Sequence, residues 1–131
     1  MHGKRKNMTI REIAAVLEAT WLCCEEEGDR VVQSAFASDM MSDVLAFVTE
    51  DTLLLTGLIN SQSVRTAEML DLPALVFVRG KNPHQDAVER AKMIGIPALT
   101  TQLTMYEACG RLYGAGVRGV AIEDYDGEMD L

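Results

Sequence analysis

One heptapeptide occurs twice in this chain and constrains its fold more than any other feature. Met69–Leu75 reads MLDLPAL, and Met93–Leu99, which starts 24 residues further on, reads MIGIPAL. Each copy combines the end of a helix-like pattern, a break at or just before a proline and the start of an apolar run. An interval of this length fits one strand, one helix and two short loops. The repeat therefore predicts successive strand–helix units.

Three apolar runs supply the strands of these units. They are Thr52–Thr56 (TLLLT), Ala74–Val78 (ALVFV) and Ala98–Thr101 (ALTT). Nearly continuous apolar runs of this length are typical of parallel strands that are covered on both faces. Right-handed crossovers place the intervening helices on the faces of the sheet. We therefore predict an α/β fold with three layers, α/β/α, around a mostly parallel central sheet.

Helix start signals recur between and around the apolar runs. Thr9 and Glu12 have the spacing of a capping box, as do Thr104 and Glu107, and each pair precedes an apolar stripe. Asn82–Pro83 places a capping residue before a proline that suits the first position of a helix. A further crossover helix is expected at residues 61–70, where apolar residues again recur at helical spacing.

Weaker signals complete the predicted order of elements. Strands are expected at Thr20–Cys24 and Arg30–Phe36, on either side of a charged turn. A short helix is expected at Ser38–Leu45, capped by the serine or the aspartate at its start. Gly114–Val120 is rich in glycine and is a candidate edge strand.

The chain has the length and composition of one domain. We expect a basic flexible start at residues 1–8, a single α/β domain at 9–120 and an acidic mobile tail at 121–131. The basic start has no apolar stretch directly behind it, so it does not have the pattern of a secretory signal. No apolar run approaches the roughly 18 residues of a membrane helix. The expected location is the cytoplasm.

The charge balance argues against polyanionic partners. Twenty acidic residues outnumber twelve basic ones and give a formal net charge of −8. Such a surface repels phosphate backbones, and no basic face with interleaved aromatic residues is present. The three basic residues at positions 4–6 form too short a run to bind strongly at physiological salt. We predict neither a nucleic-acid nor a membrane partner.

The sequence holds none of the common catalytic or cofactor-binding motifs. It has no GxxxxGK[ST] phosphate loop, GxGxxG, HExxH or GxSxG. Its three cysteines form no CxxC pair, and Cys23 and Cys24 are expected to give one buried and one partly exposed thiol. Asp39 and Asp43, one helical turn apart, could bind a divalent cation; the alternative is a helix cap beside a solvated carboxylate. We predict no catalytic residue, no metal and no cofactor.

Polar residues follow the predicted central strands at the edge of the sheet where ligands of such folds bind. Ligands in open parallel sheets lie outside the carboxyl ends of the strands. The candidate residues there are Thr56, Gly57, Asn60, Arg79, Gly80, Lys81, Asn82, Thr100 and Thr101. Hydroxyls, glycine amides and two cations suit a small anion or a nucleotide. The alternative is that these residues only make the turns and caps that the fold requires.

Several segments of the chain resemble the DRTGG domain family. The resemblance rests on MTIREIA at 8–14, SDMMSDVLA at 38–46, GIPALTT at 95–101 and YEA at 106–108, in that order, and it extends over residues 8–116. The chain looks like a stand-alone member of that family. The resemblance implies a three-layer α/β domain similar to the amino-terminal domain of HPr kinase. It also implies a regulatory role, because the family occurs in regulatory regions of phosphotransacetylases and nucleotide-regulated pyrophosphatases and tends to mediate dimer contacts.

Three hypotheses follow, in decreasing order of support. The first is a non-catalytic regulatory module that self-associates as a homodimer and docks on a partner protein. The second is a sensor of a small anionic ligand such as a nucleotide or an acyl phosphate, and the third is a metal-dependent enzyme that uses Asp39 and Asp43. For the homodimer, Met40 and Met41 are the candidate interface residues. A helix as short as theirs cannot bury both against its own sheet, and an exposed methionine suits an adaptable contact.

Overall fold

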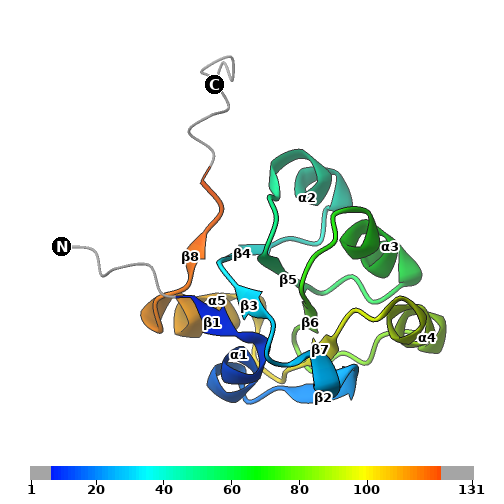
Figure 1. Ribbon diagram of the computed structural model, residues 1–131, viewed down its shortest axis with the longest axis horizontal. Helices are drawn as coiled ribbons and strands as arrows, with labels where there is room; N and C mark the ends of the chain where they lie inside the picture. Colours follow the sequence, from blue (N-terminus) through cyan, green and yellow to red (C-terminus); the bar gives the residue numbers. More distant parts are fainter. Residues whose placement is uncertain (1–6, 122–131) are drawn as a thin grey trace.

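The structure, a computed structural model, describes residues 7–121 and has three layers (Figure 1). In chain order, its elements are β1 (Met8–Thr9), α1 (Ile10–Leu17), β2 (Thr20–Cys23), the 3-10 turn η1 (Glu25–Glu27), β3 (Val31–Val32), β4 (Ser34–Ala37), α2 (Met41–Phe47), β5 (Thr52–Thr56), α3 (Ser61–Met69), β6 (Leu75–Phe77), α4 (Gln85–Ile94), β7 (Ala98–Thr100), α5 (Met105–Gly114) and β8 (Arg118–Gly119). Residues 1–6 and 122–131 lie outside the described part, and with them most of the predicted basic start and acidic tail. Met8, which was assigned to that start, lies in β1.

The central sheet has six strands in the order β2-β7-β6-β5-β4-β8. Neighbouring strands from β7 to β8 run parallel, and β2 pairs antiparallel with β7 at the opposite edge. The three apolar runs form β5, β6 and β7, so the prediction that they are central and mutually parallel is confirmed. The predicted edge strand near the carboxyl end is confirmed as β8. Two further strands, β1 and β3, form a separate antiparallel ribbon.

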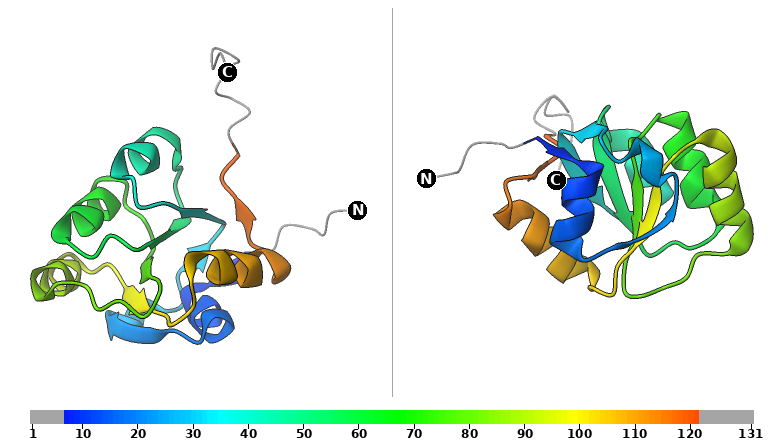
Figure 2. Two further views of the ribbon diagram at one scale, coloured as in Figure 1. Left: turned by 180° about the vertical axis from the view of Figure 1, so that it is seen from behind. Right: turned by 60° about the horizontal axis from the view of Figure 1, so that its bottom comes forward.

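Helices cover both faces of the central sheet. α2, α3 and α4 lie side by side on one face, and α1 and α5 lie on the other (Figures 1 and 2). Alternate residues of β5 point to opposite faces of the sheet. Leu53 and Leu55 pack with α1 and α5, whereas Leu54 packs with α2 and α3. All five residues of β5 are buried. The observed layers agree with the α/β/α fold that the apolar runs predict.

The clearest local signals act as the sequence analysis expects. The Thr9 side chain accepts from the Glu12 amide at 3.1 Å, and the Glu12 side chain accepts from the Thr9 amide at 2.9 Å, which completes the first capping box. Thr104 accepts from the Glu107 amide at 3.3 Å and so caps α5, but the Glu107 side chain makes no return hydrogen bond to the Thr104 amide, so the second predicted capping box forms only in half. α4 ends at Ile94, and the residue that follows and caps it, Gly95, has φ 79° in the left-handed region where glycine is favoured.

Two predicted caps are wrong. α2 starts at Met41, and neither Ser38 nor Asp39 caps it: Ser38 Oγ accepts from the Met40 amide at 2.9 Å, and Asp39 points to the end of β5. α4 starts at Gln85 after His84, two residues later than a cap at Asn82 would place it, and it has no side-chain cap. In both segments the residue that resembles a cap lies in a loop that tertiary contacts shape, so the local pattern misplaces the first turn.

The strand predicted at Arg30–Phe36 is also wrong as a single element. It divides at Gln33 into β3, which pairs with β1, and β4, which enters the central sheet. The Gln33 amide donates to the Asp51 carbonyl at 2.8 Å, so the chain is held to the start of β5 at the division. The partners that separate the two strands lie far away along the chain, and the local sequence does not reveal them. Within the described part, no helix is both long enough and apolar enough to cross a membrane.

Burial of the central strands gives a direct test of the fold. Val76 lies in β6 with an exposed fraction of 0%, so Val76→Asp places a charge between the two helical layers. Such a group costs several kcal/mol against a total stability of about 5–15 kcal/mol, so we expect the variant to be unfolded by circular dichroism. Val31→Asp is the control, because Val31 in β3 is 44% exposed. A cooperatively folded Val76→Asp protein would contradict the covered sheet.

Candidate functional site

The carboxyl ends of β4, β5, β6 and β7 meet at one edge of the sheet. The connections after β4, β5 and β6 lead to helices on one face, whereas the connection after β7 leads to α5 on the other face. Neighbouring parallel strands whose connections diverge in this way mark the crevice at which ligands bind in open α/β sheets. In this sheet β6 and β7 are that pair.

Asp39, which follows β4, holds the loop at the end of β5. Its Oδ1 accepts from the Gly57 amide at 2.6 Å and from the Thr56 hydroxyl at 3.2 Å. The Thr56 oxygen in turn accepts from the Leu58 amide at 3.1 Å. Because Thr56 and Gly57 are buried, the carboxylate satisfies donors that have little access to water. It therefore ties the end of β4 to the end of β5.

Arg79, which follows β6, brings a positive charge to the same place. Its backbone has φ 65°, a left-handed conformation that is uncommon for a residue other than glycine. Its guanidinium lies against the α-carbon of Gly57, where an added Cβ would collide with it and would come within 3.3 Å of Asp39 Oδ1. Glycine at position 57 therefore leaves the space that the guanidinium occupies beside the carboxylate.

Lys81 adds a second cation from the same loop. Its Nζ lies 3.5 Å from the Gly57 carbonyl oxygen, to which it donates. The loop after β7 fixes the backbone: the Gly80 amide donates to the Thr101 carbonyl at 2.8 Å, and the Thr100 hydroxyl donates to the Lys81 carbonyl at 3.0 Å. Two cationic side chains are thereby presented toward Gly57 by a loop that the neighbouring strand supports.

The structure brings together some of the predicted ligand-site residues and separates others. Thr56, Gly57, Arg79, Gly80, Lys81 and Thr100 share the cluster around Gly57. Asn60 instead caps α3 by accepting from the Gln62 amide at 3.0 Å, and the Thr101 hydroxyl donates to the Leu17 carbonyl at 2.7 Å in the layer of α1 and α5. Asn82 is exposed in the loop before α4.

One residue of this region has a different role from the one that the sequence analysis gives it. Asp39 is assigned there to a helix cap or a metal pair, yet it anchors the loops at the centre of the cluster. Gln102 lies over Gly80, where an added Cβ would come 2.6 Å from its side-chain oxygen. The rule that ligands bind outside the carboxyl ends of parallel strands, here called the strand-end rule, selects Thr56 and Arg79. It would select Asp39 as well, because Asp39 follows the carboxyl end of a parallel strand.

The residues considered for metal or thiol chemistry lie in other surroundings. Among residues 7–121, no group of three or more histidine, cysteine, aspartate or glutamate side chains could hold a metal ion. Cys23 is buried and Cys24 is partly exposed, as expected. Burial, and then the hydrogen bond with Cys23, raises the pKa of Cys24 to about 12, and burial also raises the pKa of Cys109. Since the thiolate is the nucleophilic form, Cys24 and Cys109 are poor nucleophiles at neutral pH.

The two candidate interface residues face in different directions. Met41 is 4% exposed and packs in the core with α3, whereas Met40 is 60% exposed at the start of α2. The expectation that a helix this short cannot bury both methionines therefore agrees with the structure. Of the pair, Met40 alone presents its side chain to solvent.

Comparison with known proteins finds likeness in fold. No protein-family model matches the chain, and no curated protein matches it in sequence. The chain is similar to the crystal structure of the CBS and DRTGG domains of the regulatory region of Clostridium perfringens pyrophosphatase, complexed with the activator diadenosine tetraphosphate. The TM-score is 0.67 at 18% identity, with 88% of this chain and 51% of that chain covered.

The likeness supports a DRTGG-like fold, in agreement with the resemblance in the sequence segments. The described chain is a mixed α/β domain with a mostly parallel central sheet, and its neighbour is a regulatory region of an enzyme. The chain spans about half the length of that neighbour. At this level of identity, the comparison extends to the fold and to no individual residue.

The role of Asp39 can be tested by removing its carboxylate. Asp39→Ala leaves the buried Gly57 amide without its acceptor, which costs about 1–3 kcal/mol. We expect the free energy of unfolding, measured by urea denaturation, to fall by about that amount. Asp43→Ala is the matched control, because Asp43 is an exposed carboxylate in the first turn of α2 and its loss costs about 1 kcal/mol or less. Equal effects of both substitutions would contradict the anchoring role.

Proposed function

We propose that this chain is a non-catalytic regulatory module that senses a small anionic ligand, such as a nucleotide or an acyl phosphate, at the carboxyl ends of β5 and β6. One observation carries the proposal: Arg79 and Lys81 both direct their charged ends at Gly57, at the carboxyl end of β5 and beside the strand pair β6 and β7 whose connections diverge. A paired guanidinium and ammonium group recognises phosphate and carboxylate oxygens. The whole chain carries a net charge of −8, so this local concentration of positive charge is unusual.

The local charge favours an anion even though Asp39 is present. Two cations face one carboxylate, and Asp39 uses Oδ1 on the Thr56 hydroxyl and the Gly57 amide. These two donors and the Arg79 guanidinium are the groups that a phosphate oxygen would use. In this proposal Asp39 occupies the place of a ligand oxygen in the ligand-free protein, and an incoming anion competes with it.

That competition gives the proposed site a way to signal. Asp39 lies between β4 and α2, and the neighbouring Ser38 hydroxyl accepts from the Met40 amide. Displacement of the Asp39 carboxylate would release the segment that sets the start of α2. The left-handed backbone of Arg79 supports the same interpretation, because strained residues cluster where structure serves ligand binding or switching. The signal would then reach a docked partner protein through α2.

The fold likeness offers independent support for a regulatory role. The similar Clostridium perfringens structure is a regulatory region with a nucleotide activator bound. A diadenosine polyphosphate carries several phosphate groups, and phosphate is the chemistry that the Arg79 and Lys81 cluster fits. The support concerns the class of ligand, because residue roles do not transfer at 18% identity.

Self-association with docking on a partner protein is the second candidate function. The exposed Met40 favours it, since a flexible thioether beside a helix start suits an adaptable contact. If Met40 forms the homodimer contact, Met40→Glu gives a folded monomer, and light scattering at micromolar protein concentration detects it. The two candidates are compatible, because a regulatory module can bind a ligand and a protein at different surfaces.

The sensing proposal predicts ligand-dependent stabilisation. A thermal-shift panel of inorganic phosphate, acetyl phosphate, ATP, diadenosine tetraphosphate and magnesium compares the intact chain with Arg79→Gln and Lys81→Gln. A ligand at a hundred times its Kd stabilises the folded state by about 2.7 kcal/mol, which raises the melting temperature by several degrees. We expect such a rise with at least one phosphate compound and at least a tenfold weaker Kd in each variant.

Arg65→Gln is the matched control for this experiment. Arg65 is an exposed arginine of α3, away from Gly57, so its loss changes the net charge equally without touching the cluster. A rise that persists in the Arg79 and Lys81 variants but falls in the control would place the ligand elsewhere. No rise with any phosphate compound contradicts sensing, and a rise with magnesium that Asp39→Asn and Asp43→Asn abolish would favour the metal-dependent enzyme.

A further inference from the structure

The outer face of α5 exposes aromatic residues beside glycines. We define this face by Tyr106, Glu107, Gly110, Arg111, Tyr113 and Gly114, which line a shallow depression on the surface. Tyr106 is 87% exposed and Tyr113 is 54% exposed. Large aromatic side chains of this kind favour protein interfaces, because they offer contact area at low cost in conformational entropy.

The glycine in the middle of this helix has no function within the described fold. A Cβ added at Gly110 meets no atom within 4 Å, and Gly110 lies outside the set of residues with positive φ. A glycine in a helix interior costs about 1 kcal/mol relative to alanine. The fold of the single chain offers no compensation for that cost. A surface that approaches the backbone of α5 closely would supply one.

We propose that the outer face of α5 pairs with the same face of a second copy of this chain, with the two helices antiparallel and crossing at Gly110. A homodimer contact of this type is isologous, which means that both copies contribute the same surface. Each residue of that surface must therefore fit the residue that the two-fold axis places opposite it. The face of α5 meets that requirement in both its aromatic and its charged residues. The proposal rests on the self-association candidate and is independent of ligand sensing.

Helix geometry fixes which residues would meet. With about 100° and 1.5 Å per residue, Tyr106 and Tyr113 lie on one flank of Gly110, and Glu107 and Arg111 lie on the other. The two-fold rotation keeps each flank on its own side and reverses the order along the axis. Tyr106 then lies about 1.5 Å along the axis from the partner's Tyr113, and Glu107 lies about 3 Å from the partner's Arg111.

Both pairings are chemically favourable. Two tyrosine rings at this offset can stack or meet edge to face. Glu107 is exposed, and its carboxylate has no hydrogen bond or ion pair with another described residue, so a cation from a second copy would be its first partner. Arg111 donates from Nη1 to Glu18 at 3.2 Å, and an arginine has further donors for a second carboxylate. Opposite charges at matching positions are the complementarity that the proposal requires.

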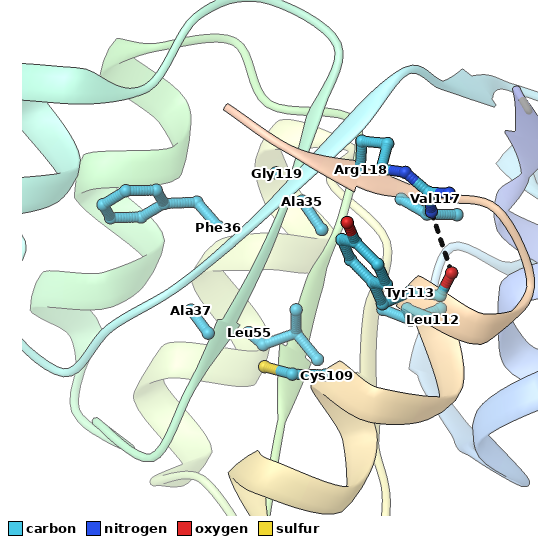
Figure 3. Close-up of a pocket in the computed structure, with 10 residues that line it drawn as sticks. All are labelled: Ala35, Phe36, Ala37, Leu55, Cys109, Leu112, Tyr113, Val117, Arg118 and Gly119. Atoms are coloured by element: carbon cyan, nitrogen blue, oxygen red, sulfur yellow. Dashed lines mark hydrogen bonds between the residues drawn. The ribbon is translucent and has the colours of Figure 1, made fainter. Parts of the chain in front are cut away.

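Tyr113 is already held in place for such a contact. The Arg118 guanidinium lies 4.1 Å from the centre of the Tyr113 ring, and Arg118 Nη1 donates to the Tyr113 carbonyl at 2.9 Å (Figure 3). The ring stands at the edge of a pocket of about 150 Å³ between α5 and β4, which Leu55 and Leu112 also line (Figure 3). An aromatic ring that is fixed before binding loses less conformational freedom on association.

Met40 is the competing surface for a second copy. It directly precedes α2, and α2, α3 and α4 lie on the opposite side of the sheet from α5 (Figures 1 and 2). Met40 and Leu45 are the exposed apolar side chains of this segment, and α2 carries no basic residue that could pair with Asp43 across a two-fold axis. The structure therefore favours α5 over Met40 as the homodimer contact.

A substitution at Gly110 tests the dimer contact without disturbing the fold of the single chain. Gly110→Gln adds a side chain whose Cβ meets no atom within 4 Å in the single chain, and it improves helix propensity, so we expect a folded protein with an unchanged or raised melting temperature. The same side chain holds the paired helices apart, and we expect the dimer Kd to rise at least a hundredfold. Analytical ultracentrifugation over a micromolar concentration series measures it. Met40→Glu is the control and should leave the dimer intact.

Disulfide trapping tests the antiparallel crossing. Gly110→Cys in a Cys109→Ser background places two thiols at the two-fold axis, where the α-carbons must lie within about 7 Å to be bridged. We expect a covalent dimer after mild oxidation, and no covalent dimer from Met40→Cys in the same background. A monomeric intact chain, a dimer that Gly110→Gln leaves unchanged, or trapping at Met40 in place of Gly110 would each overturn the proposal.

Discussion

Burial of β5 on both faces is the constraint on which the rest of the structure depends. Its five residues alternate between two helical layers, so no position along the strand is left for a solvated side chain. The polar groups of the strand are therefore confined to its ends. Thr52 shares a hydrogen bond of 2.8 Å with Ser34 at one end, and Thr56 donates to Asp39 at the other. The sheet thus places Thr56 and Asp39 at the edge where the loops that follow β4 to β7 meet.

The same constraint explains how much of the fold could be predicted from the sequence. Continuous apolar runs and the repeated heptapeptide depend on contacts that every strand–helix unit makes, so they predict β5, β6, β7 and their order. The division at Gln33 depends on Asp51 and on the ribbon with β1, and a local pattern holds no information about such partners. Asn82 does not cap α4 for a related reason: the loop after β6, which contains Asn82, is hydrogen-bonded to the loop after β7.

The candidate site, like the fold, could be predicted from the sequence only in part. The strand-end rule predicts the neighbourhood of Thr56 and Arg79, because it follows from the parallel sheet alone. It does not predict which way a side chain turns: Thr101 donates to Leu17 in the opposite layer, away from the crevice. Asp39 was assigned to other roles because its partners Thr56 and Gly57 lie 17 and 18 residues away along the chain. Recognition of its role requires the pairing of β4 with β5, which the structure supplies.

The two proposed surfaces are joined by a short hydrogen-bonded path. The Arg79 amide donates to the Leu103 carbonyl at 2.7 Å, and Leu103 adjoins Thr104, the residue that caps α5. A ligand that changes the loop of Arg79 would therefore act directly on the loop that sets the first turn of α5, the helix that carries Gly110. If both proposals hold and the two sites are coupled through this loop, linkage requires the effect to be mutual: a ligand that favours the dimer must bind more tightly to the dimer by the same factor. The loop from Thr101 to Thr104 is then the element through which an anion would control assembly.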